Sequence, residues 1–145
     1  MIIEFIIPYI VGPKGNSKRA WKSGAHFTVT HDPKVAENAG TLASLCVPYI
    51  PAKPITGPVS ATYEFTYPWR KPDQKRRDRG KLPARMPKAT RPDTGQLIKQ
   101  LDDVLQKCGF FADDAQIYHH DASKWYSDQS GVRVRLESCA SDGGA

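Results

Sequence analysis

The sequence predicts a small single domain of the α+β class, with a mixed sheet and two main helices. A chain of 145 residues has the length of one domain, and a hydrophobic content of 39% is sufficient for one core. Strand-like and helix-like patterns are interspersed, but their connections are too short and irregular for a doubly wound sheet. We expect the domain to cover residues 1–137 and residues 138–145 to form a flexible tail.

The N-terminal run Ile2–Ile7 is predicted to be a buried strand because it is almost entirely apolar. It is too short to cross a membrane, and it lacks the basic flank and cleavage pattern of a signal peptide. We therefore expect no membrane association and a cytoplasmic location. A connection rich in Gly, Lys and Arg follows over residues 12–24, and residues 26–30 form a short extended piece.

The first helix is predicted to begin at Asp32-Pro33, with Asp32 as its N-cap and Pro33 in its first turn. Apolar residues then recur at helical spacing, at Val35, Ala39, Leu42 and Cys46. Three prolines, Pro48, Pro51 and Pro54, end this helix.

The second half of the chain contains the clearest patterns. Residues 59–67 alternate between apolar and polar, which predicts a half-buried strand. A second helix is predicted from Thr94 to Cys108, and Gly109 ends it. Its apolar face consists of Leu97, Ile98, Leu101, Val104, Leu105 and Cys108. Residues 115–119 and 132–137 are predicted to be two further strands.

The positive charge of the chain belongs to one segment, Pro68–Arg91. This segment contains ten basic and two acidic residues and carries +8, whereas the rest of the chain carries −2. Cationic side chains suit phosphate oxygens and give affinity without sequence information. We therefore expect a nucleic-acid partner here. The basic residues are Arg70, Lys71, Lys75, Arg76, Arg77, Arg79, Lys81, Arg85, Lys88 and Arg91.

The same segment is predicted to lack regular structure. Four prolines and Gly80 interrupt it, so residues 68–92 are expected to form a long, basic, mobile loop. Long loops within small domains are usually functional or disordered. Trp69 is a candidate for stacking on an unpaired base. The alternative is a loop that only increases solubility.

The three cysteines, Cys46, Cys108 and Cys139, have no short paired spacing. This pattern argues against a disulfide framework and against a zinc site, so we expect three reduced thiols.

The residues most suited to chemistry lie between Asp93 and Asp114. Asp93 precedes the second helix, and Lys99 and Asp103 share one helical face because they are four residues apart. Asp113-Asp114 follows the turn at Gly109, so the chain could return Asp114 towards Asp93. Two converging carboxylates beside a basic surface would suit Mg²⁺ and phosphodiester cleavage. The alternative is that Asp93 only caps the helix and Asp113-Asp114 lies in a solvated turn.

This segment resembles the RusA-type Holliday junction resolvases. The matching residues are Arg91-Pro92-Asp93-Thr94-Gly95-Gln96-Leu97-Ile98-Lys99, then Asp103-Val104-Leu105, then Gly109-Phe110-Phe111-Ala112-Asp113-Asp114-Ala115-Gln116-Ile117. The family pattern is roughly basic-Pro-Asp-x-Asp-Asn-Leu-x-Lys, then Leu-Asp-Ala-Leu, then Gly-aromatic-x-x-Asp-Asp-Ala-Gln-Val. The composite pattern is fairly specific, whereas each block alone is weak.

The resemblance implies a small α+β homodimer that nicks four-way DNA junctions with Mg²⁺ (Mn²⁺ being a possible substitute), in recombination, repair or a phage-type setting. A two-fold symmetric enzyme suits a two-fold symmetric junction. By resemblance, Asp93, Lys99 and Asp114 are catalytic, and Asp93, Asp113 and Asp114 hold the metal. Asp103 matches the family's helix aspartate. Lys124 resembles a lysine that often follows the last block.

One position departs from the family pattern: Gly95 stands where the second aspartate is expected. The substitution removes a ligand and a negative charge from a metal pocket. Asp113 is the nearest acid that could substitute for it, and Asp73 or Asp78 could approach from the basic segment. Two functions therefore remain open, an active nuclease and a branched-DNA-binding protein with little or no cleavage. A basic adaptor that binds protein is a third, weaker hypothesis.

The adjacent pair His119-His120, with Asp121 beside it, is a candidate transition-metal site. Adjacent residues of a strand point to opposite faces, so one of the two is expected to be buried and the other exposed. A third ligand is missing, which argues against the metal site.

Overall fold

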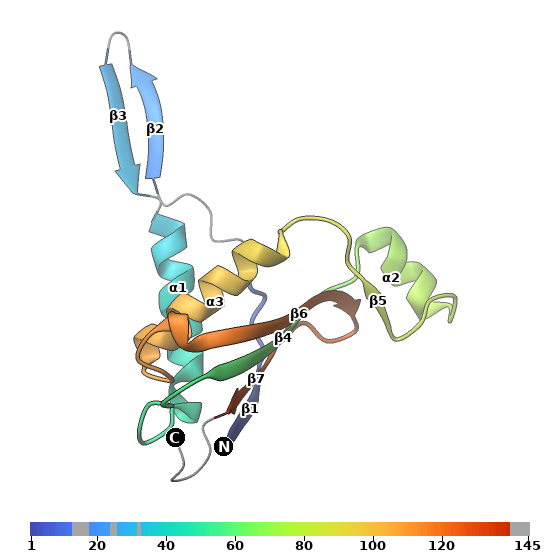
Figure 1. Cartoon of the computed structure of the whole chain (residues 1–145). Coiled ribbons are helices and arrows are strands. Elements are labelled where there is room, and N and C mark those ends of the chain that lie inside the picture. Colours follow the sequence, from blue (N-terminus) through green and yellow to red (C-terminus); the bar gives the residue numbers. More distant parts are fainter. Residues whose placement is uncertain (13–17, 24–25, 32, 140–145) are drawn as a thin grey trace.

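The computed structural model describes residues 1–12, 18–23, 26–31 and 33–139 (Figure 1). The elements follow in the order β1 (Ile2–Ile7), β2 (Lys18–Ser23), β3 (His26–His31), α1 (Pro33–Cys46), η1 (Val47–Tyr49), β4 (Val59–Tyr67), α2 (Lys71–Asp78), β5 (Arg85–Pro87), α3 (Thr94–Cys108), η2 (Asp114–Gln116), β6 (Ile117–Ser127) and β7 (Gly131–Ser138). The predicted α+β class is confirmed.

Five strands form the main sheet in the order β1-β7-β4-β6-β5, and β2 pairs with β3 in a separate two-stranded sheet. Strands β4 and β6 are parallel, and the other pairs in the main sheet are antiparallel. The predicted mixed sheet is therefore confirmed. The parallel pair is joined by a long crossover that includes α2, β5 and α3.

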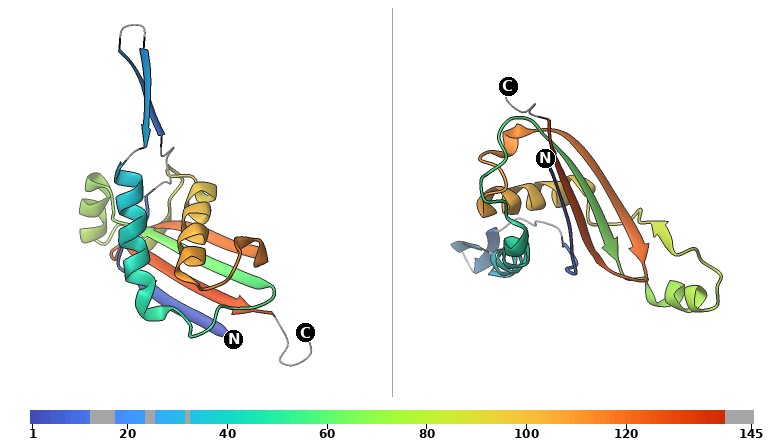
Figure 2. Two further views of the ribbon diagram at one scale, coloured as in Figure 1. Left: turned by 90° about the vertical axis from the view of Figure 1, so that its left-hand side faces the viewer. Right: turned by 90° about the horizontal axis from the view of Figure 1, so that it is seen from below.

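The helices α1 and α3 lie on one face of the main sheet, and the other face is open (Figure 2). Alternation along β4 produces this arrangement, because every second residue from Val59 to Tyr67 is buried. One buried row crosses the sheet from Phe5 through Val134 to Tyr63. Leu97, Leu101 and Leu105 of α3 and Leu42 of α1 complete the same core.

The prediction that β1 is a buried strand holds for only one of its faces. Phe5 and Ile7 are in the core, but Ile2 and Ile6 are exposed on the open face. The physical reason is that β1 is an edge strand and helices cover only one side of the sheet. An apolar run alone does not distinguish these two situations.

Most predicted elements agree with the structure. The strand β4 and the helix α3 have the predicted bounds, and α1 begins at Pro33. Gly109 adopts φ 93°, the left-handed conformation that ends a helix. Residues 18–23, expected in a connection, instead form β2. The proposed N-cap Asp32 and the tail after Cys139 lie outside the described residues.

The basic segment is not the featureless loop that the sequence predicted. It contains α2 and the short strand β5. Pro72 lies in the first turn of α2, where a missing N–H costs little. Pro68 and Pro83 lie outside the helix, and Gly80 adopts φ 71° just after it. Pro72 is therefore compatible with the start of the helix, and the other prolines lie outside it.

The strand predicted at residues 115–119 begins later and is much longer. Residues 114–116 form the 3-10 turn η2, and β6 extends from Ile117 to Ser127. The sequence of β6 shows no clear apolar–polar alternation, because many residues on both of its faces are polar. All three cysteines are free thiols, as expected. Within the described residues, no helix combines the length and the apolar character needed to cross a bilayer.

The turn before β7 depends on a glycine. A Cβ at Gly131 would lie 2.6 Å from the backbone oxygen of Ile7. We expect Gly131→Ala to lower the free energy of unfolding by about 1–3 kcal/mol, because strand β1 must shift. Gly40→Ala in α1 is the control, since a Cβ there meets nothing within 4 Å. It should raise stability by about 0.5–1 kcal/mol. Urea unfolding measures both, and an equal effect of the two substitutions would contradict the prediction.

Candidate functional site

The first candidate residue, Asp93, occupies the N-cap position of α3 but does not cap the helix through its side chain. Its backbone oxygen accepts hydrogen bonds from the N–H groups of Gln96 and Leu97, at 3.1 and 3.2 Å. The carboxylate is exposed and has no hydrogen bond or ion pair within the described residues. It therefore remains available for a ligand at the positive end of the helix dipole.

Lys124, on β6, fixes the chain that leads into Asp93. Its ammonium group donates to the backbone oxygens of Thr90 and Pro92, both at 2.8 Å. These bonds tie the end of β6 to the start of α3. In this structure Lys124 therefore positions the Asp93 segment.

Lys99 and Gly95 lie on the first two turns of α3, and both are exposed. Lys99 has no hydrogen bond or ion pair in the described part of the chain. A Cβ at Gly95 would meet nothing within 4 Å. Close packing therefore does not explain the glycine, and a larger residue would fit. Asp103, four residues after Lys99, is half-buried on the same helix.

The turn that carries Asp113 and Asp114 is held by two glutamines. Gln116 accepts from the N–H groups of Ala112 and Asp113 and donates to the backbone oxygens of Ile55 and Gly57. Gln106 of α3 accepts from the N–H of Asp114 at 2.9 Å. The Asp113 side chain caps η2 by accepting from Ala115. The Asp114 carboxylate is exposed and makes no such bond, so it is the freer of the two acids.

Asp93 and Asp114 are not brought together within one chain, contrary to the expectation that the chain returns Asp114 to Asp93. Asp114 is bonded to Gln106, which follows Asp93 by thirteen residues, or about 20 Å of helix axis. Strand β6 runs back along α3, but it is Lys124 that arrives beside the Asp93 segment. The described residues contain no group of three or more His, Cys, Asp or Glu able to hold a metal ion.

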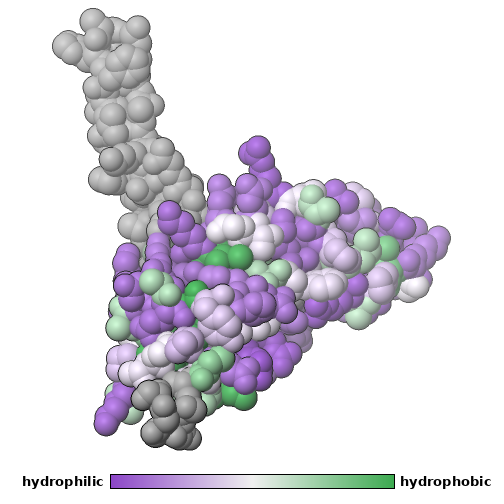
Figure 3. Space-filling view, viewed as in Figure 1, coloured by the Kyte–Doolittle hydropathy of each residue, from purple (hydrophilic) through white to green (hydrophobic). Residues whose placement is uncertain are grey.

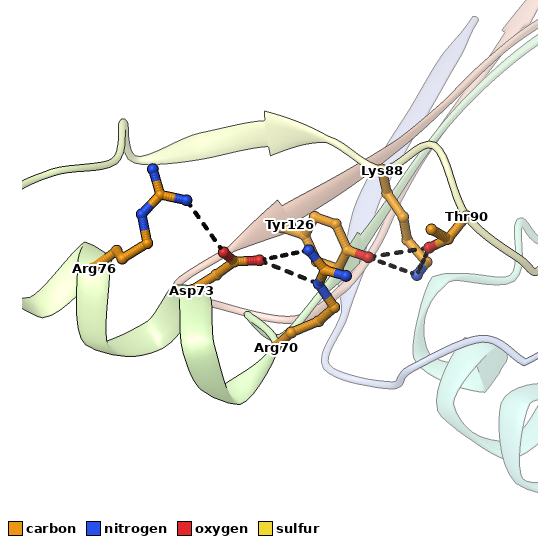
Figure 4. A network of polar contacts seen from close by, with 6 residues as sticks. All are labelled: Arg70, Asp73, Arg76, Lys88, Thr90 and Tyr126. Atoms are coloured by element: carbon orange, nitrogen blue, oxygen red, sulfur yellow. Dashed lines mark hydrogen bonds and ion pairs between the residues drawn. The ribbon is translucent and has the colours of Figure 1, made fainter.

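The two acids considered as substitutes from the basic segment are engaged within α2. Asp73 pairs with Arg70 at 3.0 Å and lies 3.7 Å from Arg76. Asp78 accepts from Gln74. Figure 4 shows Asp73 between the two arginines. These contacts stabilise α2, and they hold both acids within the basic segment.

A buried polar cluster beside α3 was missed in the sequence. Asp102 is only 7% exposed, accepts from the Tyr63 hydroxyl at 2.6 Å, and lies 2.9 Å from Nε2 of His120. Burial raises the pKa of Asp102, and the charge of Asp114 raises it further. The sequence did contain a signal, because Asp102 lies next to the apolar face formed by Ile98 and Leu105. Neither His119 nor His120 is fully buried, contrary to expectation.

The basic helix α2 is anchored to the end of the sheet through Trp69. Its indole is 6% exposed, packs against Tyr126 and donates to Asp128. Arg77 also binds Asp128, at 3.0 Å, and donates to the backbone oxygen of Leu82. Trp69 is therefore part of the core and is not presented for base stacking, which corrects that expectation. Arg77 is occupied as an anchor.

The remaining basic residues fall into two groups. Some have partners: Arg85 lies 3.7 Å above the Trp125 ring, and Lys88 donates to Thr90 and Tyr126 (Figure 4). The hydrogen bond between Thr90 and Tyr126, with Lys88 nearby, lowers the pKa of Tyr126. The second group is exposed and has no partner among the described residues: Lys71, Lys75, Arg79, Lys81 and Arg91. Figure 3 shows mostly hydrophilic residues over the tip that carries α2.

A sequence model described as "Endodeoxyribonuclease RusA" matches residues 11–137. The chain belongs to the RusA family. Proteins of this family are endonucleases that resolve Holliday junctions, and they generally depend on a divalent metal. A comparison with curated proteins gave no significant match. The match covers both candidate carboxylate positions, Lys99 and the basic segment of this RusA-family chain.

The buried carboxylate predicts a pH dependence of stability. Folding raises the pKa of Asp102 above its unfolded value of 3.8. Between the unfolded and the folded pKa, the native state therefore binds more protons than the unfolded chain. The free energy of unfolding contributed by Asp102 therefore falls as the pH rises through this window. Asp102→Asn does not titrate, so its stability should decrease less over the same range. Urea unfolding at a series of pH values above 3.8 measures the difference, and parallel curves would contradict the prediction.

Proposed function

We propose that this protein is a structure-selective endodeoxyribonuclease that resolves four-way DNA junctions by magnesium-dependent phosphodiester hydrolysis. We further propose that it acts as a homodimer in DNA recombination and repair, in a compartment that contains DNA. Two-fold symmetry would give one site for each cut strand. The proposal rests on the family of the chain and on the side chains that its fold leaves available.

The observation that carries the proposal is a set of exposed ionic groups without structural partners. The carboxylates of Asp93 and Asp114 and the ammonium group of Lys99 have no hydrogen bond or ion pair in the described part of the chain. Buried and paired ions are usually structural, whereas exposed, unpaired groups held on well-packed elements can meet a ligand. We assign the catalytic roles to these three residues, with Asp103 and Lys124 in support.

The donor atoms suit magnesium in kind. Mg²⁺ prefers oxygen ligands, keeps several waters, and is commonly held by one or two carboxylates together with substrate phosphates. Asp114, with Asp113 beside it, supplies such carboxylates at one end of α3, and Asp93 supplies one at the other end. A bound Mg²⁺ would neutralise phosphate charge and make a bound water more acidic. We assign to Lys99 the stabilisation of negative charge on the phosphate.

The DNA contact is proposed to lie on and beside α2. Lys71, Lys75, Arg79, Lys81 and Arg91 are the strongest candidates because no acidic partner competes with phosphate for them. Arg70, Arg76, Arg85 and Lys88 have protein partners but remain near the same surface. Trp69 and Arg77 hold this surface in position through their bonds to Asp128. These contacts would position a branched duplex without reading its sequence.

A second function, junction binding with weak or no cleavage, is favoured by one observation. Gly95 provides no carboxylate, and the structure shows no packing reason for a glycine there. A site with fewer acids binds a divalent cation less tightly. Cleavage and binding must therefore be measured separately.

The assignment of the free cations predicts a change in salt dependence. A Lys75→Ala, Arg79→Ala double variant should bind a four-way junction more weakly. The slope of log Kd against log salt concentration should decrease by about two, because each phosphate contact contributes about 0.9. Gel-shift titrations at several salt concentrations measure the slope.

The charge-matched control is Arg133→Ala, Arg135→Ala. Both arginines are on β7 and pair with Glu4 of β1, at the edge of the main sheet opposite to β5. This variant should largely retain the wild-type slope. If the two double variants lose affinity equally, the effect comes from net charge, and the α2 surface is not the contact.

Cleavage of a labelled synthetic four-way junction tests the catalytic part. We expect nicking with Mg²⁺ or Mn²⁺ and at least a tenfold loss in Asp114→Asn. Gly95→Asp should increase cleavage at low metal concentration, because it adds a carboxylate at a position where a Cβ meets no neighbour. An acid in the first turn should also stabilise α3 by about 1 kcal/mol.

The two functions give different outcomes in this assay. A folded protein that binds the junction but does not nick it in either metal supports the binding protein and excludes the nuclease. Restoration of nicking by Gly95→Asp would identify the missing carboxylate as the cause. Equal binding of junction and linear duplex would contradict both functions and favour the protein adaptor.

A further inference from the structure

Asp102, Tyr63 and His120 form a buried polar cluster whose hydrogen bonds are not required to fill the core. Asp102 lies on α3 and is 7% exposed, and both of its oxygens are engaged by side chains from two strands. Tyr63 of β4 donates to Oδ1 at 2.6 Å, and Nε2 of His120 on β6 lies 2.9 Å from Oδ2. Burying a carboxylate is costly, and an apolar side chain would fill this space at lower cost. The arrangement therefore calls for a role beyond packing.

The cluster fixes the orientation of the His120 ring. A carboxylate accepts hydrogen bonds, so Nε2 donates its N–H to Asp102 and the lone pair is on Nδ1. Nδ1 has no hydrogen-bond partner within the described residues. The His120 side chain is 29% exposed, so water or a phosphate group can approach the ring. The result is an oriented imidazole whose outer nitrogen is free to accept a proton.

The position of this imidazole relates it to the proposed site. Gly95, Lys99, Asp102 and Gln106 are separated by four, three and four residues, so they lie along one side of α3. At the end of this row, Gln106 binds the backbone of Asp114, and the charge of Asp114 acts on Asp102. His120 projects to the same side from β6. His120 therefore lies between the helical turn of α3 that contains Lys99 and the turn η2 that contains Asp114.

The ionisable groups around His120 come from three elements. Asp102 is on α3, Tyr63 is on β4 with its ring centroid 6.0 Å from that of His120, and Asp114 is on η2. On β6 itself, Lys124 shares the face of His120 because it lies four residues away. Tyr118 lies at a register shift in the pairing of β6 with β4, and its ring is near that of His119. Lys124 is already bonded to Thr90 and Pro92.

We propose that His120 is a further catalytic residue, the general base that receives a proton from the attacking water, and that Asp102 is its positioning residue. This inference rests on the proposed nuclease function. In the step, Nδ1 takes a proton as the water oxygen bonds to phosphorus. The bond between phosphorus and the leaving sugar oxygen breaks, and that oxygen keeps the electron pair and is protonated by solvent. The imidazolium proton is then returned to solvent.

The first test compares two adjacent histidines in single-turnover junction cleavage. His120→Ala should lower the cleavage rate by about 10²- to 10⁴-fold, the usual contribution of a general base. Junction affinity should change little, and the rate is compared at a temperature at which thermal unfolding shows both variants to be folded. His119→Ala is the matched control, because His119 lies on the opposite face of β6, and it should cleave at the wild-type rate. Equal rates in wild type and His120→Ala would overturn the proposal.

The pH profile separates a general base from a structural side chain. The wild-type cleavage rate should increase with pH, as expected for a general base, and His120→Ala should lack this increase. Asp102→Asn should lower the rate and alter the pH profile. Tyr63→Phe, which keeps the bond between Asp102 and His120, should lose less activity. An unchanged profile in His120→Ala would exclude the role even if its rate is lower.

A measurement without cleavage keeps the inference testable if the wild type proves inactive. Nitrogen NMR of the histidine rings should show the Nε2–H form of His120, and Asp102→Asn should abolish this preference. An uncut four-way junction held with Ca²⁺ should shift the Nδ1 signal of His120 and leave that of His119 unchanged. Failure to cleave, with this shift present, would refute the nuclease and leave His120 at the DNA contact. Absence of the shift would overturn the inference itself.

Discussion

The packing of α3 against the buried face of β4 and β6 is the contact on which the rest of the site depends. Leu97, Leu101 and Leu105 fill the space above the alternating residues of β4. This contact fixes the rotation of α3, so the row from Gly95 to Gln106 must face β6. Since β6 runs back along the helix, its side chains meet that row at successive positions. The core therefore determines which polar groups can act together.

The same arrangement explains why the site is extended. Asp93 is at the beginning of α3 and Asp114 is beside its end, so the helix itself separates the two acids within one chain. Lys124 holds one end of this surface, and Gln106 and Gln116 hold the other. Between them lie Lys99 and the cluster of Asp102 and His120. A DNA strand laid along α3 would meet these groups in succession.

The basic region is built in a different way from the core site. Helix α2 has no buried residue of its own, and its position depends on Trp69, Arg77 and Asp128 at the end of the sheet. A few anchoring contacts hold it, while most of its lysines and arginines face solvent. Because the anchoring contacts involve few of its basic side chains, this basic helix of eight residues has a fixed position and keeps most of its positive charge unpaired. The charge remains available to a polyanion.

The sequence alone determined the elements with strong periodicity and the family of the chain. The alternating pattern of β4 and the apolar face of α3 were sufficient to predict these two elements. A strand buried on one face has an apolar period of two residues, and a helix buried on one face has a period of about 3.6. The Asp93–Asp114 pattern and its departure at Gly95 could also be recognised from the sequence, because a sequence pattern depends only on residue order. Composition also located the positive charge correctly.

Only the tertiary structure decided which of these residues meet. The separation of Asp93 from Asp114 depends on how β6 returns along α3, and the burial of Trp69 depends on Tyr126 and Asp128, both distant in sequence. Asp102, Tyr63 and His120 come from three different elements, and no local pattern connects them. Residue order specifies local periods, whereas long-range packing specifies which side chains come into contact. For this reason the oriented imidazole became visible only in the fold.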